Sequence, residues 1–178
     1  MSKNIYCIGK IKDNQTTLEV ALKNNKEPIK AAPAKRVDIV RIQIIKESSM
    51  LYKDRKVGSP KDAFNLMKGF FEFADRELMI VCSLDTKNQP ITINVASIGT
   101  LNSSLVHPRE LFKAAILSNA ASIIVAHNHP SGNPEPSSED MNITNRLKEC
   151  GKLLGIELID HIIIGDERFA SLKEKGIL

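Results

Sequence analysis

Hydrophobic and polar positions along the chain follow strand-like and helix-like spacing in turn. Residues 37–45 interleave apolar and polar side chains, and this alternation predicts a strand. Ser59 followed by Pro60 is typical of a helix start, with the serine as cap and the proline in the first helical position. The apolar positions that follow repeat on one face, which we expect to be buried: Ala63, Leu66, Met67, Phe70 and Ala74.

A hairpin and then a strand–helix alternation make up the rest of the chain. Residues 77–84 and 91–98 are apolar stretches on either side of a polar turn, which predicts two paired strands. Later elements are expected as a helix from Pro108 to about residue 119, a strand at 122–126, a helix from Ser138 that ends at Gly155, and a strand at 156–164. Helices between strands need a sheet to cover, so we expect an α/β fold with a mixed β-sheet layered with helices.

Composition limits the kinds of protein that this chain can be. A chain of 178 residues with 42% apolar residues fits one packed domain, and it holds no apolar run long enough to span a membrane. Its three cysteines are odd in number and widely spaced, which argues against a disulfide framework or a thiolate metal site. We therefore expect a soluble, cytoplasmic protein with free and mostly buried thiols.

Positive charge is concentrated at the start of the chain. Residues 1–36 hold eight Lys or Arg against three Asp or Glu, whereas the remainder holds 17 against 18. We divide the chain into a basic N-terminal arm or linker at 1–36 and a domain at 37–178. A basic arm can bind nucleic acid by releasing counterions, although short lysine-rich termini are more often solvated tails.

Two histidines separated by one residue follow the strand expected at 122–126. Side chains at i and i+2 of an extended segment lie on the same side, so His127 and His129 can bind one metal ion. Asp140 supplies a third ligand if the proline-rich loop at 127–137 folds back, because it lies in the first turn of the next helix. Two histidines and one carboxylate leave a position for a water that ionises at about pH 7. We expect one zinc ion per chain at this site.

A zinc hydrolase also needs a group that transfers the proton of the attacking water. Glu77 is our candidate, since it begins a strand that is otherwise expected to be buried and can project from the sheet end toward the metal. Glu110 is the rival, although a glutamate early in a helix is commonly explained by the helix dipole. Ser137 matches a helix capping box with Asp140, and its hydroxyl is also placed to donate to an oxyanion. His161 lies within a buried strand and is expected to be structural.

These residues resemble a known family. The JAMM (MPN+) metalloprotease motif is reproduced by His127-x-His129, seven residues, then Ser137-x-x-Asp140. Three wider stretches resemble the RadC branch of that family: 99–111, 127–140 and 158–165. The resemblance covers roughly residues 60–178. It implies a JAMM/MPN-like fold with a cytidine-deaminase-like architecture, zinc on the two histidines and the aspartate, a serine near the oxyanion, and an upstream glutamate that Glu77 matches by order.

The resemblance implies a zinc metallopeptidase or isopeptidase that acts on a protein or peptide. Relatives that cleave ubiquitin usually have Ser or Thr between the histidines, whereas this chain has Asn128, so a ubiquitin-like substrate is not implied. The alternative is a DNA-associated RadC-like binding module in DNA repair or mobile-element biology. Longer RadC proteins carry a helix-hairpin-helix module, for which residues 1–36 are too short. A zinc deaminase is excluded, because it needs HxE with PCxxC.

Overall fold

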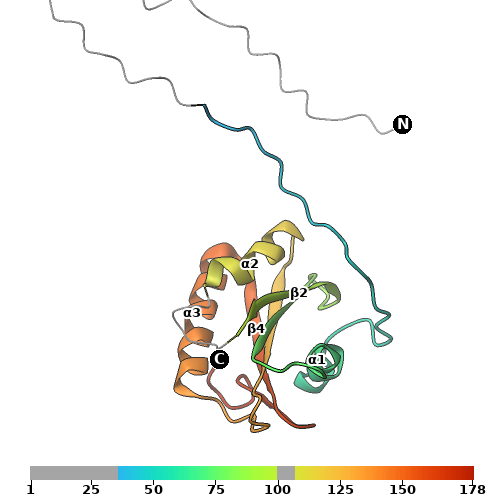
Figure 1. The fold of residues 1–178 in the computed structure, drawn as a ribbon, viewed down its shortest axis with the longest axis vertical. Helices are drawn as coiled ribbons and strands as arrows, with labels where there is room; N and C mark the ends of the chain where they lie inside the picture. Colours follow the sequence, from blue (N-terminus) through green and yellow to red (C-terminus); the bar gives the residue numbers. More distant parts are fainter. Residues whose placement is uncertain (1–35, 100–106) are drawn as a thin grey trace, which may run out of the picture. The chain divides into compact units, whose positions relative to one another are not determined.

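The computed structural model describes residues 36–99 and 107–178, and within them five strands form one mixed sheet (Figure 1). Its strand order is β2-β1-β3-β4-β5. The hairpin strands β1 and β2 are antiparallel, β1 is also antiparallel to β3, β3 and β4 are parallel, and β5 is antiparallel to β4. The strands span Leu78–Leu84 (β1), Pro90–Ile98 (β2), Ser122–Asn128 (β3), Glu157–Ile164 (β4) and Phe169–Ser171 (β5).

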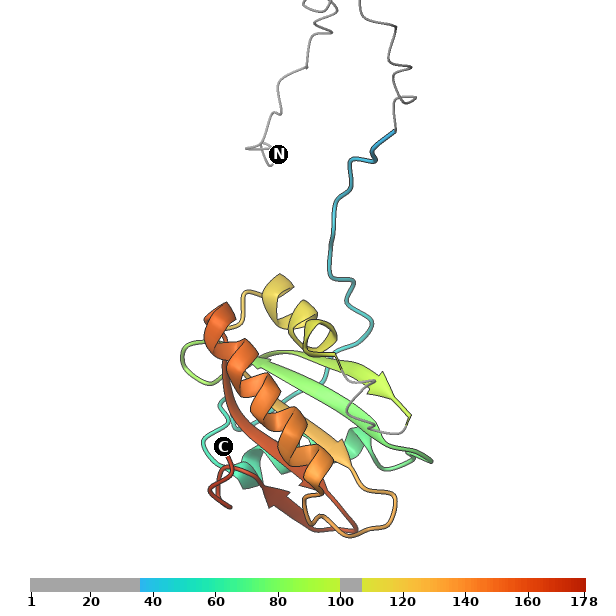
Figure 2. The same ribbon diagram turned by 90° about the vertical axis from the view of Figure 1, so that its left-hand side faces the viewer.

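Helices cover both faces of this sheet (Figures 1 and 2). One face packs against α1, which spans Pro60–Met67 and continues into a short 3-10 helix, η1, at Lys68–Phe70. The other face packs against α2, Pro108–Leu117, and α3, Ser138–Leu154. Each face has its own apolar core. The expected α/β fold with a mixed sheet is confirmed.

Alternation along the central strand β3 decides which side chains reach which layer. Ile123 and Val125 are buried in the core under α2 and α3, whereas Ile124 and Ala126 are buried in the core under α1. All seven residues of β3 are buried. His127 follows Val125 by two positions, so the pleat directs its side chain toward the α3 layer.

Helix termini follow the expected chemistry. The Ser59 side chain accepts a hydrogen bond from the Asp62 backbone N–H at the start of α1, with Pro60 in the first turn. Ser137 caps α3 within a complete capping box, and Gly155 ends that helix in the left-handed conformation with φ of 69°. A glycine adopts this conformation without the steric penalty of a Cβ atom, which is why the helix ends there.

Several sequence-based expectations are wrong in detail. Residues 36–50 contain neither helix nor strand, and Val37 and Ile39 are 83% and 95% exposed. Alternation alone does not make a strand, because a strand also needs a neighbour to satisfy its backbone hydrogen bonds. The helix after Pro60 is shorter than expected, so Phe70 is 40% exposed and Ala74 lies beyond it. Strand β5 was not predicted, since three residues show too little periodicity.

Other expectations fall partly outside the described residues. The basic arm lies outside them apart from Arg36, and nucleic-acid binding by it stays a prediction. Cys82 is free and buried and Cys150 is free and half-buried, as expected, while Cys7 is not described. None of the helices in the described residues has the length and apolarity to cross a membrane.

Candidate metal centre

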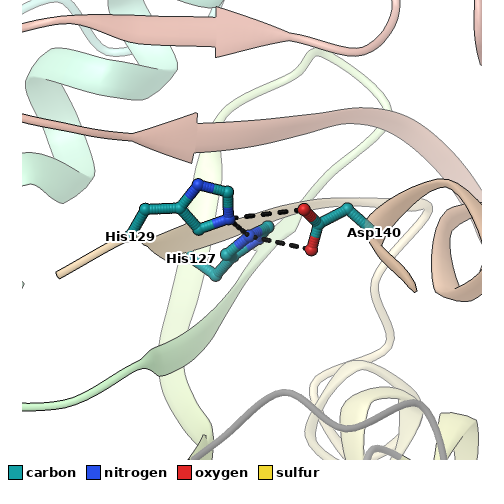
Figure 3. A group of neighbouring side chains, drawn as sticks. All are labelled: His127, His129 and Asp140. Atoms are coloured by element: carbon teal, nitrogen blue, oxygen red, sulfur yellow. Dashed lines mark hydrogen bonds and ion pairs between the residues drawn. The ribbon is translucent and has the colours of Figure 1, made fainter. Parts of the chain in front are cut away.

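Three side chains converge at the end of β3 nearest the start of α3 (Figure 3). His127 belongs to β3, His129 follows that strand directly, and Asp140 lies in the first turn of α3. One ligand atom from each residue lies within 4.8 Å of the others. The two Nε2 atoms are 3.0 Å apart, and Asp140 Oδ1 is 3.1 Å from His127 Nε2 while its Oδ2 is 3.3 Å from His129 Nε2. The structure thus brings together all three residues expected to bind zinc.

Backbone pairing keeps the side chains of His127 and His129 on the same side of an extended segment. β3 extends two residues further than its apolar run, so His127 is paired with Met79 of β1 and with Ile163 of β4. The His129 backbone N–H then donates to Ile164 O at 2.9 Å, which prolongs the β3–β4 pairing. With the backbone still extended, residues 127 and 129 point the same way, as the i, i+2 argument requires.

Asp140 is held as a carboxylate by the helix start that carries it. Its Oδ2 accepts hydrogen bonds from the Ser137 backbone N–H at 2.8 Å and from the Ser137 hydroxyl at 2.7 Å, while Ser137 Oγ accepts from the Asp140 N–H at 3.1 Å. Burial alone raises the pKa of this carboxyl, but His127 in its protonated form, through a hydrogen bond and its charge, and the two Ser137 donors bring the pKa well below its ordinary value. Asp140 is therefore a negatively charged candidate ligand.

A buried chain of polar groups lies behind His127. His127 Nδ1 is 2.7 Å from Nε2 of His161 on β4, and His161 Nδ1 is 2.6 Å from Oγ1 of Thr144 on α3. The Thr144 hydroxyl donates to the Asp140 carbonyl oxygen at 2.6 Å. His127, His161 and Thr144 are completely buried. This series of hydrogen bonds links one candidate ligand on the sheet, His127, to the backbone of another on the helix, Asp140.

Donor and acceptor roles in this chain follow from its carbonyl end. Because a carbonyl oxygen only accepts, the Thr144 proton is used there, and His161 must donate to Thr144 through Nδ1–H. Burial lowers the His161 pKa well below its ordinary value, and any positive charge on His127 lowers that pKa further, so His161 is neutral and its Nε2 accepts from His127 Nδ1–H. In neutral His127, the Nε2 atom that faces Asp140 therefore carries a free lone pair.

His129 is oriented in the same sense by the loop that follows it. Its Nδ1 donates to the Asn133 carbonyl oxygen at 2.7 Å, which leaves the Nε2 atom as the acceptor in the neutral ring. Two lone-pair nitrogens and a carboxylate thus face each other, and only a cation or a proton between them relieves the repulsion. Two imidazoles and one carboxylate are a donor set that zinc accepts, with the backs of the histidines hydrogen-bonded as in known sites. The residues fit a divalent metal.

Two glycines allow the loop between the ligands to fold back. Gly132 has φ of 77°, and its carbonyl oxygen accepts from the Asp166 N–H at 3.1 Å in the turn between β4 and β5. A Cβ atom on Gly165 would lie 2.2 Å from that carbonyl oxygen. The loop and the turn therefore touch through backbone atoms. Gly165 was not singled out from the sequence.

The expected catalytic groups lie in different surroundings. Half-buried Glu77 directly precedes β1, and its carbonyl oxygen accepts from the Gly99 N–H at 2.8 Å. The backbone on both sides of it is hydrogen-bonded to the Asn128 side chain, between the two histidines. Glu110 instead lies on α2, paired with Lys113 and Arg109. It lines an open groove with β2 and residues 44–50 that includes none of the three metal-ligand candidates.

Three contacts that orient the candidate ligands were not predicted from the sequence: those of Thr144, of the Asn133 carbonyl and of His161 with His127. Strand alternation gave a usable signal for His161. In β4, Ile162 and Ile164 lie in the core under α1. Because successive side chains of a strand point to opposite faces, His161 faces α3, as His127 does. Predicting the contact also required the register between β3 and β4, which cannot be read from the sequence.

Known proteins similar to this chain identify its family. A family model described as RadC-like JAB domain matches residues 57–177. A UPF0758 protein of Clostridium perfringens is 56% identical over 123 residues, which make up 69% of this chain and 54% of that protein. A UPF0758 protein of Clostridium beijerinckii is 54% identical over 125 residues, 70% of this chain and 55% of the relative. One of Clostridium botulinum is 49% identical over 147 residues, 81% of this chain and 64% of the relative.

The chain thus covers less than two thirds of the length of each of these relatives. Within the chain itself, the family model extends from Val57, the first buried residue of the described part, to the last residue but one. It includes every strand and helix of the fold and all three converging side chains. On this match, the chain belongs to the RadC-like JAB domain family.

Proposed function

We propose that this domain is a zinc-dependent hydrolase that cleaves peptide or isopeptide bonds in a protein or peptide substrate. The observation that carries the proposal is the set of acceptor atoms on His127, His129 and Asp140, turned toward one point by hydrogen bonds to the opposite ring nitrogens of the histidines and to the Asp140 carboxylate. A JAB-type domain and a two-histidine, one-carboxylate donor set support hydrolysis rather than a purely structural metal site.

His127, His129 and Asp140 would hold the ion. Zinc in such a site supplies Lewis acidity and lowers the pKa of a bound water to about 7. The protein's own contribution is to turn the Nε2 atom of each imidazole toward the ion and to keep the aspartate ionised. Because His127 and Asp140 are 0% and 3% exposed, the histidine and carboxylate are also shielded from competing solvent.

Glu77 is the group that would take up and pass on the proton of the attacking water. Its peptide lies beside β3, since the adjacent Leu78 N–H donates to the Asn128 side chain at 2.7 Å. Glu110 lacks such a link to the histidine segment and is engaged by two cations. A positioned general acid–base group typically contributes about 10²–10⁴-fold to the rate.

Ser137 would assist by donating to the oxyanion that forms during attack on a carbonyl. Its hydroxyl donates to Asp140 Oδ2 in the present arrangement, so it lies next to the ligand carboxylate. For the proposed role the hydroxyl must turn from Asp140 to the substrate oxygen, a rotation about one side-chain bond. The contact with Asp140 Oδ2 and the contact with the oxyanion would therefore use the same hydroxyl proton in turn.

Metal content and turnover test this function together. Protein purified without chelators should contain about one zinc per chain by elemental analysis, and zinc-loaded protein should cleave members of a fluorogenic peptide library. Glu77→Gln should keep its zinc and lose about 10²–10⁴-fold in kcat, because the amide cannot accept the proton. The matched control Glu110→Gln should keep wild-type turnover. Metal-free wild-type protein, or full activity in Glu77→Gln, would contradict the proposal.

A further inference from the structure

Asn128, the residue between the two histidines, makes two hydrogen bonds to the chain that carries Glu77. Its Oδ1 atom accepts from the Leu78 backbone N–H at 2.7 Å, and its Nδ2 atom donates to the Arg76 carbonyl oxygen at 3.1 Å. Asn128 is 7% exposed. The side-chain amide therefore bonds the backbone on both sides of Glu77 from a shielded position.

This contact continues the hydrogen bonding between β1 and β3 beyond the last backbone pair of the two strands. The antiparallel pairing of β1 with β3 ends at Met79 opposite His127, so Leu78 has no backbone partner on β3. Asn128 itself is paired through its backbone with Ile164 of β4. Its side chain extends in the opposite direction, toward β1, and supplies the acceptor for the Leu78 N–H that the β3 backbone does not supply.

Glu77 is consequently fixed from two neighbouring strands. On the β3 side the Asn128 amide bonds Arg76 and Leu78, and on the β2 side the Gly99 N–H donates to Glu77 O at 2.8 Å. The peptide group that carries the carboxylate thus has little freedom to move along or away from the sheet. Because Asn128 is covalently joined to both histidines, the same residue relates the position of Glu77 to the metal ligands.

We propose that Asn128 is a positioning residue for Glu77, and this rests on the hydrolase function proposed above. The role requires one acceptor and one donor at opposite ends of a short planar group, which asparagine provides. Alanine offers neither. Serine offers a single short hydroxyl that cannot span both peptide groups.

A double-mutant cycle in the zinc-loaded protein tests this role. The variants are Asn128→Ala, Asn128→Ser, Glu77→Gln and Glu77→Gln combined with Asn128→Ala, with exposed Asn145→Ala on α3 as the matched control. The readouts are kcat and KM on a fluorogenic peptide that the wild type cleaves, zinc affinity by chelator competition, and hydrogen exchange of the Leu78 amide.

Asn128→Ala should lower kcat about tenfold or more, a share of the full acid–base contribution, with KM and zinc affinity changed by less than about threefold. In the Glu77→Gln background the same substitution should have almost no further effect, because the two residues act as one unit. The Leu78 amide should lose exchange protection in Asn128→Ala. Asn145→Ala should match the wild type in every readout.

Several results would overturn the role. Additive losses of kcat in the two backgrounds would show that Asn128 does not act through Glu77, and a parallel fall in zinc affinity would show that it acts on the metal. Should Asn128→Ala fail to fold, Asn128→Ser carries the same comparisons. A zinc-loaded wild type that cleaves no peptide would remove the proposed function. Leu78 exchange would then judge the contact by itself: lost protection supports it, and retained protection overturns it.

Discussion

His127 and His161 share a hydrogen bond of 2.7 Å between Nδ1 and Nε2, and this bond determines which nitrogen of His127 faces Asp140. The two residues are 34 positions apart in the sequence and lie on neighbouring parallel strands. His161 in turn is fixed by Thr144 on α3. His161, which is not part of the converging cluster, thus controls which ring nitrogen His127 presents to that cluster.

Replacing His161 should therefore weaken metal binding without removing a ligand. In His161→Phe the acceptor for His127 Nδ1–H is lost, and zinc affinity should fall by about 10- to 100-fold, as for other partners of ligating histidines. His161→Gln, which offers a carbonyl acceptor, should lose less. Chelator competition measures both, with exposed His107→Ala as the control. A His161→Phe protein that folds and binds zinc like the wild type would contradict the assigned hydrogen-bond direction.

Gly165 should tolerate no side chain. A Cβ atom there would lie 2.2 Å from Gly132 O and 2.9 Å from Pro134 Cδ, in the loop that orients His129. Gly165→Ala should lower the free energy of unfolding by about 1–3 kcal/mol, since backbone atoms must shift, and should also weaken zinc binding. Gly69→Ala meets no atom within 4 Å and should change stability by less than about 0.5 kcal/mol. Urea unfolding compares the two, and equal effects would contradict the close approach.

Asp160 should make stability depend on pH. Burial raises the pKa of its carboxyl above the ordinary 3.8, although the Ser171 hydroxyl and two backbone N–H groups donate to it. The folded state therefore binds the proton more tightly than the unfolded state, so this contribution is fully present below 3.8 and is lost as pH rises through the folded pKa.

Asp160→Asn removes that dependence and serves as the reference. The free energy of unfolding of the wild type minus that of Asp160→Asn should increase as pH is lowered from neutral toward 3.8, the ordinary pKa. Urea unfolding in the presence of chelator at a series of pH values measures the difference, and other titrating groups cancel between the two proteins. A difference that shrinks on acidification would show that the donors outweigh burial.

Cys82 should be unreactive in the folded protein. Burial raises the pKa of its thiol to about 12, so almost no thiolate is present near neutral pH. Cys150 is half-buried and should react. In a Cys7→Ser variant, native alkylation followed by mass spectrometry should find label on Cys150 alone, and both thiols should be labelled in denaturant. Rapid native labelling of Cys82 would indicate that the α1 side of the sheet opens readily.

The sequence predicted most elements because local signals and packing agree in them. Ser59, Pro60 and Gly155 mark helix ends by their own stereochemistry, and the buried runs of β1 and β3 need no distant information. The strand expected at residues 37–45 failed for the opposite reason: its alternation is local, but a strand exists only with a hydrogen-bonded neighbour.

Prediction of the site had a similar limit. The i, i+2 spacing, the acidic residue just inside the next helix and the resemblance to the JAMM motif together predicted that His127, His129 and Asp140 meet. The partners that orient them come from elsewhere: His161 depends on the β3–β4 register, and the Asn128 contact depends on where the β1–β3 ladder stops. Register is set by the packing of whole faces and is not written in any short motif.

The capping box of α3 helps to order the side chains of the candidate metal centre before any ion binds. Ser137 and Asp140 satisfy each other as the helix forms, and His127 and His129 are turned by partners that also belong to the fold. Side-chain entropy at the ligands is therefore lost when the chain folds and not when an ion arrives. We expect capture of a cation to be fast and its affinity to track the integrity of this helix start.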